Sequence, residues 1–144
     1  MTGTLTSVAA IGCGLVGGVF FAFSTFVMQG LGKVPAAKGA AAMQGINVAA
    51  PTPLFMTALF GTAAVCIAAM IADGGAQVIA GGIVYLAGVI GVTAAFNVPR
   101  NNALAAVDAD SPEAAGLWQR YLREWTAWNH VRTLSGIAAA ALLI

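Results

Sequence analysis

The sequence has very few charged residues, and this scarcity restricts what the protein can be. Only 8% of its 144 residues are charged, whereas 60% are hydrophobic, and the mean hydropathy is +0.89. Soluble domains contain about 25% charged residues on average, so this chain has too few ions to cover a soluble surface. The net charge of +1 does not indicate nucleic acid as a partner.

Metal-binding and nucleophilic residues are also scarce. Cys13 and Cys66 stand alone in apolar runs without CxxC or metal-ligand spacing, so we expect both to pack in the core. One histidine and scattered carboxylates cannot supply the three protein ligands of a zinc or iron site. Covalent catalysis is disfavoured because Ser24 and Ser135 have no placed base. A haem needs only one axial histidine, so haem bound through His130 remains an alternative.

Long apolar runs make up most of the chain. Three of them, 1–32, 39–72 and 74–99, contain no charged residue, and each exceeds the roughly 20 residues that span a bilayer as a helix. Glycine and alanine are abundant, as they are where membrane helices pack closely. The first run lacks a preceding basic segment and is longer than the apolar core of a typical signal peptide, so we interpret it as a retained helix.

These runs predict an all-α integral membrane fold, a four-transmembrane-helix bundle that forms one domain over 1–144. We expect spans at about 5–31, 53–72 and 77–97, with a short interfacial helix between the first two. The segment "ADGGA" predicts a tight turn between the second and third spans.

The last helix is expected to be long, over about 112–144, because "DSPE" has the residues of a helix start. Thr133–Ile144 contains only 12 residues, too few to span a bilayer, whereas counting back to Trp125 gives 20 residues. Twenty residues of helix are about 30 Å long. We therefore expect an amphipathic first half and a membrane-embedded part from about 125.

Basic residues predict the orientation of the bundle. Lys33 and Lys38 lie in the first loop, and Arg100, Arg120 and Arg123 lie in the third loop and the start of the last helix. The positive-inside rule then places loops 1 and 3 in the cytoplasm and both termini outside, in a multi-pass protein of the cell (inner) membrane.

Polar signals gather at the same end of the predicted bundle. "MQGIN" carries Gln44 and Asn47, and "FNVPRNN" carries Asn97 and Asn101. Both segments meet the start of the last helix, which contains "WTAWNHVR". The sequence therefore predicts a polar, aromatic-lined pocket at the cytoplasmic end.

On the last helix, steps of 100° place five residues on one stripe: Tyr121, Trp125, Asn129, Arg132 and Gly136. One interpretation is an interfacial belt with a snorkelling arginine. The other is a substrate site, because an arginine and an asparagine that face a bundle interior often mark one. His130 lies about 160° round the helix from Arg132, so a straight helix cannot direct both into one small volume. A role for His130 as base or ligand stays open beside a structural one.

The first helix carries glycines and aromatic residues with packing roles. Gly14 and Gly18 have the i, i+4 spacing of a close helix–helix contact. Four phenylalanines near its end are expected to pack in the core: Phe20, Phe21, Phe23 and Phe26. They could also line a binding site for a flat aromatic substrate.

Four segments occur in order over nearly the whole chain: "GGVFFAFSTFVMQGL", "AAMQGIN", "FNVPRNNAL" and "WTAWNHVRTLSGIAAAALL". Together they resemble the small bacterial members of the anthrone oxygenase-like membrane family. The resemblance implies a four-helix membrane bundle that oxidises an anthrone to an anthraquinone with molecular oxygen, without a flavin or external reductant. The matching positions are Asn97, Asn101, Trp125, Asn129 and Arg132, with His130 as in a bacterial-type WNHxR.

The resemblance and the residues together give a hypothesis for the site. A base, either His130 or a water that it holds, removes a proton from the anthrone, and Arg132 with Asn97 or Asn129 stabilises the enolate oxygen. The expected catalytic residues are therefore His130, Arg132 and Asn97. The expected substrate-binding residues are Asn101, Trp125, Asn129, Tyr121, Asn47 and Phe23.

Molecular oxygen is the expected co-substrate, with no flavin or metal. The expected partners are a hydrophobic aromatic small molecule and the lipid bilayer, and assembly into a homo-oligomer is open. Whether the chain is catalytic at all is also open. The alternative is a non-catalytic small membrane protein that binds a lipid or small molecule, or a subunit of a larger membrane complex. A small transporter is disfavoured because the chain shows no broken helix or charged mid-membrane relay.

Overall fold

The structure, a computed structural model, describes residues 2–144, and every regular element in this range is a helix. Four of the elements, labelled η, are π-helical turns. The elements are α1 (Thr2–Ala22), η1 (Phe23–Val27), α2 (Met28–Gly32), α3 (Ala36–Ala49), α4 (Pro53–Met56), η2 (Thr57–Gly61), α5 (Thr62–Asp73), α6 (Ala76–Tyr85), η3 (Leu86–Gly91), η4 (Thr93–Asn97), α7 (Val98–Ala105) and α8 (Pro112–Leu143).

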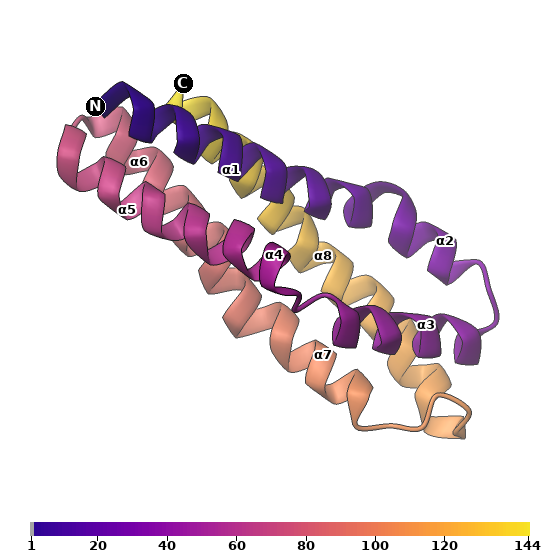
Figure 1. Cartoon of the computed structure of the whole chain (residues 1–144). Helices are drawn as coiled ribbons and strands as arrows, with labels where there is room; N and C mark the ends of the chain where they lie inside the picture. Colours follow the sequence, from indigo (N-terminus) through magenta and orange to yellow (C-terminus); the bar gives the residue numbers. More distant parts are fainter. Residues whose placement is uncertain (1) are drawn as a thin grey trace.

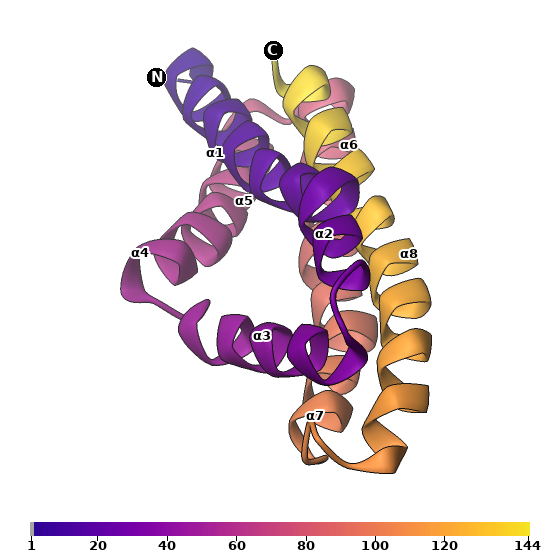
Figure 2. The same ribbon diagram turned by 90° about the vertical axis from the view of Figure 1, so that its right-hand side faces the viewer.

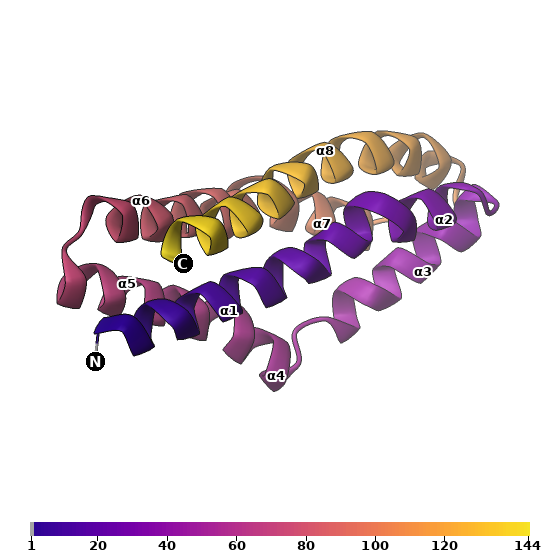
Figure 3. The same cartoon turned by 90° about the horizontal axis from the view of Figure 1, so that it is seen from above.

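Consecutive elements join into four long helices and one short helix. α1 continues through η1 into α2, α4 through η2 into α5, and α6 through η3 and η4 into α7, while α8 alone has 32 residues. The long helices run along a common direction, and both termini lie at the same end (Figure 1). Seen from above, α6 and α8 form one layer and α1 and α5 the other (Figure 3). The predicted all-helical fold is confirmed.

Three helices, not the four expected, are long and apolar enough to cross a membrane: Gly3–Gly32, Pro53–Asp73 and Ala76–Ala105. α8 is long enough but differs in composition, because Asn129, His130 and Arg132 interrupt its apolar half. These polar residues lower its hydropathy below that of the other three helices. Its role as a fourth span therefore does not follow from its length and composition.

Local sequence signals set the ends of several helices. The Thr52 hydroxyl accepts a hydrogen bond from Phe55 N at 3.2 Å, and the Ser111 hydroxyl accepts one from Ala114 N at 3.3 Å, so α4 and α8 each begin with a side-chain cap. Between α5 and α6, Gly74 has a φ of 68°. Glycine adopts this left-handed conformation without steric cost, which permits the tight turn.

The third long helix continues beyond its predicted end near 97. α7 extends it to Ala105 through Pro99, although proline usually clashes with the carbonyl four residues earlier. The π-helical turn η4 comes directly before, and there Val98 N donates to the carbonyl of Thr93. Pro99 consequently falls in the first turn of a new α-helical segment, where its missing N–H breaks no bond.

Two apolar clusters fill the interior, one toward the end with the termini and the other toward α3. The fully buried members of the first include Cys13, Val16, Cys66, Tyr85 and Val89. The second contains Met28, Ala40, Met43, Leu104, Trp118, Tyr121 and Trp125. The two cysteines are free, and their sulfur atoms lie 3.8 Å apart in the core.

α1 and α8 approach closely where Gly17 faces Gly136. A Cβ atom at Gly136 would lie 2.9 Å from the Cα of Gly17, so this position has no room for a side chain, and a Cβ atom at Gly17 would lie 3.3 Å from the Gly136 backbone. Gly14 and Gly18, which have the spacing of a contact motif, instead face outward with nothing within 4 Å of an added Cβ. The prediction of a close contact through Gly14 and Gly18 is therefore wrong, and Gly17 makes the contact on the first helix instead.

α3 crosses the direction of α8 in the half of the molecule away from the termini (Figure 2). Gln44 attaches it, because its side-chain amide donates to the carbonyls of Leu104 and Val107 at 2.8 and 2.9 Å. Leu104 lies in the last turn of α7 and Val107 lies two residues beyond its end, where carbonyls have no α-helical partner. The attachment holds α3 over the space between α1, α4 and α8.

Candidate active site

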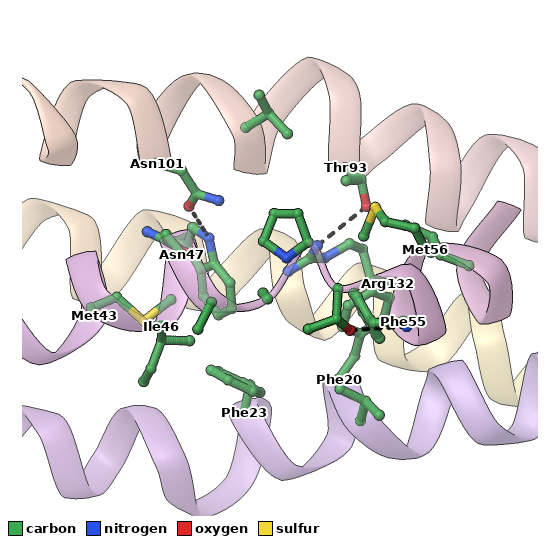
Figure 4. A pocket seen from close by; sticks show the side chains of 18 of the residues that line it. Phe20, Phe23, Met43, Ile46, Asn47, Phe55, Met56, Thr93, Asn101 and Arg132 are labelled. Carbon is green, nitrogen blue, oxygen red and sulfur yellow. Dashed lines mark hydrogen bonds between the residues drawn. The ribbon is translucent and has the colours of Figure 1, made fainter.

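A cavity of about 480 Å³ lies between α3, the start of the second long helix and the middle of the other three. Three π-helical turns contribute to its wall: η1 through Phe23, η2 through Leu59 and Phe60, and η4 through Thr93. Such turns often occur at functional sites. The wall is mostly apolar, and its polar members are Asn47, Thr52, Thr93, Asn101, Trp125 and Arg132. Figure 4 shows Arg132 and Thr93 at one end and Asn47 and Asn101 at the other.

Arg132 is the only ionisable side chain in this wall, and only 5% of it is exposed. Its Nη1 donates to the Thr93 hydroxyl at 3.2 Å and its Nη2 to Asn129 Oδ1 at 2.8 Å. The guanidinium carbon lies 4.1 Å from the ring centre of Phe20 and 5.0 Å from that of Trp125. All of these partners are neutral, and the buried Nε atom has no partner.

Asn129 positions Arg132 from within the same helix. Its amide nitrogen donates to the carbonyl of Phe20 at 2.8 Å and to the hydroxyl of Ser24 at 2.7 Å, which leaves Oδ1 for the guanidinium. Ser24 also lies 3.0 Å from the Thr133 hydroxyl. Asn129 is fully buried and does not line the cavity, so it supports the site without reaching a ligand.

Aromatic rings form much of the remaining wall. Phe23 and Trp125 pack with ring centres 5.8 Å apart, and Phe20, Phe55 and Phe60 line the cavity beside them. Two of the four phenylalanines that the sequence suggested for this role, Phe21 and Phe26, are instead exposed on the outside of the bundle. The apolar faces of such rings suit a flat aromatic ligand.

The end of the cavity away from Arg132 is held by a hydrogen-bond chain. Asn101 Oδ1 accepts from the Tyr121 hydroxyl and from Trp125 Nε1, each at 2.8 Å, while Asn47 Nδ2 donates to the Tyr121 hydroxyl at 3.4 Å. Tyr121 lies in the amphipathic half of α8, and burial raises the pKa of its hydroxyl above the ordinary value of 10. It therefore stays protonated and keeps donating to Asn101.

The structure does not bring every expected site residue to the cavity. Asn97 is buried, and its amide nitrogen donates to the carbonyl of Trp125 at 3.2 Å, but it does not line the cavity. His130 is exposed on the opposite face of α8 and does not line it either. The predicted divergence of His130 and Arg132 around α8 is thus present, and the geometry gives no support to His130 as the base.

Sequence reasoning did not find Thr93, the side chain that fixes Arg132 from another helix. Its signal is a hydroxyl inside the apolar run "GVTAAFN", one turn before Asn97. No comparable signal exists for Met43, Phe55 and Met56, whose apolar side chains line the cavity. They resemble ordinary core residues in the sequence.

Metal ligands are not gathered anywhere in residues 2–144. In this range no group of three or more His, Cys, Asp or Glu side chains could hold a metal ion. For a haem, His130 would be the one histidine ligand, and it lies on the outer surface of α8 rather than in a pocket.

The fold and the site together make the protein an all-helical bundle with a buried arginine in an aromatic cavity. The chain matches the family model described as Anthrone oxygenase over residues 40–142, most of its length. It therefore belongs to the anthrone oxygenase family, which confirms the resemblance carried by its motifs. Comparison with curated proteins gives no match, and comparison with solved structures gives none.

Proposed function

We propose that this protein is a membrane-embedded oxygenase that binds a flat, hydrophobic aromatic ketone of the anthrone type and oxidises it with molecular oxygen. The observation that carries this proposal is the buried, unpaired charge of Arg132 in an aromatic cavity. Family membership supports the same class of reaction.

The buried, unpaired charge of Arg132 favours a negatively charged ligand. A buried cation is costly unless it is paired, and every partner of Arg132 is neutral. In the described part of the chain the only ion pair is between Arg100 and Glu124, which are 3.0 Å apart and do not line this cavity. A ligand that carries a negative oxygen would complete the site.

An anthrone supplies such an oxygen when its methylene group loses a proton. The enolate oxygen then binds Arg132, whose planar guanidinium offers several donors in a fixed arrangement. Because these donors are already oriented by Thr93 and Asn129, they stabilise the charge without reorganisation. Phe20, Phe23 and Trp125 would lie against the rings of the substrate.

The enolate carbon reacts with oxygen in two balanced stages. A carbon–oxygen bond forms and one proton is taken up, which gives a hydroperoxide at the former methylene carbon. Loss of the remaining hydrogen on that carbon as a proton, with cleavage of the O–O bond and departure of water, gives the second carbonyl. Overall, a methylene group and one O₂ become a carbonyl group and one water, so no external electron donor is needed.

The first proton goes to water rather than to a protein base in this proposal. None of the residues that line the cavity is an aspartate, glutamate or histidine. Arg132 would act by lowering the pKa of the bound substrate, since a nearby positive charge favours the deprotonated form. His130 is not used.

The membrane arrangement is part of the proposal. The three apolar helices would span the bilayer, and α8 would be the fourth span, embedded from about Trp125. Arg132 then faces the interior of the bundle, where charged residues of membrane proteins are usually functional. Loops 1 and 3 would face the cytoplasm.

The test is oxygen-dependent quinone formation from anthrone in detergent, with Arg132→Lys compared with Arg120→Lys, an exposed control in the same helix. Loss of one preorganised donor to an oxyanion costs about 3 kcal/mol, so we expect about a hundredfold lower rate for Arg132→Lys and little change for Arg120→Lys. A thermal melt of each preparation separates a site effect from unfolding. Full activity of Arg132→Lys would refute the role of Arg132. Tight binding of anthrone without oxidation would favour the non-catalytic alternative.

A further inference from the structure

The end of the cavity opposite Arg132 has hydrogen-bonding groups that the proposed reaction does not use. Asn47 and Asn101 both line it there (Figure 4). They are joined through the Tyr121 hydroxyl, which accepts from Asn47 and donates to Asn101. The two amides are therefore neighbours, on α3 and α7 respectively.

The orientation of the Asn101 amide follows from its partners. An indole N–H can only donate, so the atom that faces Trp125 Nε1 at 2.8 Å must be the amide oxygen. The Tyr121 hydroxyl donates to the same oxygen at 2.8 Å. Both bonds of Oδ1 are thus made, and the amide nitrogen of Asn101 makes none with residues 2–144.

The orientation of the Asn47 amide follows from the same chain of bonds. Because the Tyr121 hydroxyl gives its proton to Asn101, it can only accept from Asn47, so the amide nitrogen of Asn47 faces it. The oxygen of Asn47 makes no hydrogen bond in the described part of the chain. One donor, Asn101 Nδ2, and one acceptor, Asn47 Oδ1, are therefore left at this end of the cavity.

A neighbouring donor and acceptor match a hydroxyl group, which accepts one hydrogen bond and donates another. We infer that Asn47 and Asn101 form a subsite that recognises a neutral hydroxyl on an outer ring of the substrate. The inference rests on the proposed function, because it assumes that the enolate oxygen occupies the Arg132 end. It adds a determinant of specificity, since a site built to hydrogen-bond a hydroxyl discriminates against an analogue that lacks it.

The experiment compares three sets of ligands in the absence of oxygen: unsubstituted anthrone, anthrones with one hydroxyl at different outer-ring positions, and the corresponding methyl ethers. A methyl ether keeps the acceptor of the hydroxyl but loses its donor. Binding is followed by quenching of tryptophan fluorescence, since Trp125 lines the cavity. The variants are Asn47→Ala and, as control, Asn102→Ala, an exposed residue outside the cavity.

We expect the wild-type protein to bind at least one hydroxyanthrone about tenfold more tightly than anthrone or its methyl ether, as two neutral hydrogen bonds would give. Asn47→Ala should reduce this preference to about twofold or less, while Asn102→Ala should retain it. Binding of hydroxyanthrone and methyl ether with equal affinity by the wild-type protein would overturn the subsite, whatever the stability of the variants.

The outcomes also separate the two proposals. If Arg132→Gln weakens all ligands equally while no ligand shows a hydroxyl preference, the subsite is refuted and the proposed function stands. An unchanged hydroxyl preference in Asn47→Ala would refute the subsite in the same way. If the wild-type protein binds none of the anthrones, both proposals fail.

Discussion

Gly17 of α1 and Gly136 of α8 bring two helix backbones so close that a Cβ atom on Gly136 would lie 2.9 Å from the Cα of Gly17. This crossing sets the position of the cavity. Phe20 lies one turn beyond Gly17, and Arg132 lies one turn before Gly136. The guanidinium consequently stacks 4.1 Å from the centre of the Phe20 ring.

The crossing predicts that Gly136→Ala lowers stability. The added methyl group would overlap the backbone of α1, and overpacking of this kind costs about 1–3 kcal/mol. Gly14→Ala is the matched control, because nothing lies within 4 Å of an added Cβ there. Thermal melts in one detergent should show a lower Tm for Gly136→Ala only. Equal melting temperatures for the two variants would contradict the close approach.

A carboxylate beside Arg132 should neutralise its charge and weaken anion binding. In Asn129→Asp, the new carboxylate lies where the amide oxygen is 2.8 Å from Arg132 Nη2, and it supplies the counter-ion within the chain. We expect the variant to melt at a lower temperature, because its second oxygen cannot donate to the carbonyl of Phe20, and to bind the substrate anion at least tenfold more weakly under conditions where it is folded. Asn102→Asp places the same charge on an exposed residue and should bind normally. Undiminished binding by Asn129→Asp would show that the charge of Arg132 is not needed.

Topology can be tested by labelling single cysteines in a background without Cys13 and Cys66. Lysines and arginines lie in or beside loops 1 and 3 (Lys33, Lys38, Arg100, Arg120 and Arg123), and none lies in the α5–α6 turn. A cysteine at Gly75 should therefore react with an impermeant maleimide outside intact cells. A cysteine at Ala106 should react only after the membrane is opened. Labelling of Ala106 but not Gly75 from outside would reverse the orientation, and labelling of both would change the number of spans.

Purified protein should contain no stoichiometric flavin or non-haem metal. The reasons are the balanced reaction with oxygen alone and the lack of clustered metal ligands among residues 2–144. An absorption spectrum and elemental analysis of an active preparation check this. A Soret band that disappears in His130→Ala would instead identify His130 as a haem ligand.

Much of the arrangement on α8 could be predicted from spacing alone. The residues placed on one stripe at 100° per step are all buried: Tyr121, Trp125, Asn129, Arg132 and Gly136. His130, on the other face, is exposed. Helical periodicity is a local property, so a long helix shows its buried face without knowledge of what covers it.

The contacts between helices could not be predicted in this way. Thr93 reaches Arg132 from 39 residues away, and Gln44 bonds to the carbonyls of Leu104 and Val107, about 60 positions further along the chain. Such contacts depend on how each helix is rotated against its neighbours. The first three long helices are apolar on every side, so their sequences do not mark an inner face. For the same reason, the sequence did not indicate that Gly17, rather than Gly14 or Gly18, contacts α8.

The π-helical turn η4 sets the number of residues between Thr93 and Asn101, which lie at opposite ends of the cavity. A π-helical turn holds one residue more than the α-helical turn it replaces. Deleting a residue such as Ala95 would let an α-helical turn replace it, so everything after the deletion would keep nearly the same facing as before. Thr93 and Asn101 would then both stay at the cavity, with one residue fewer between them. An alignment with homologues that lack this residue must therefore place the gap within η4, because an alignment without the gap would pair the wrong residues.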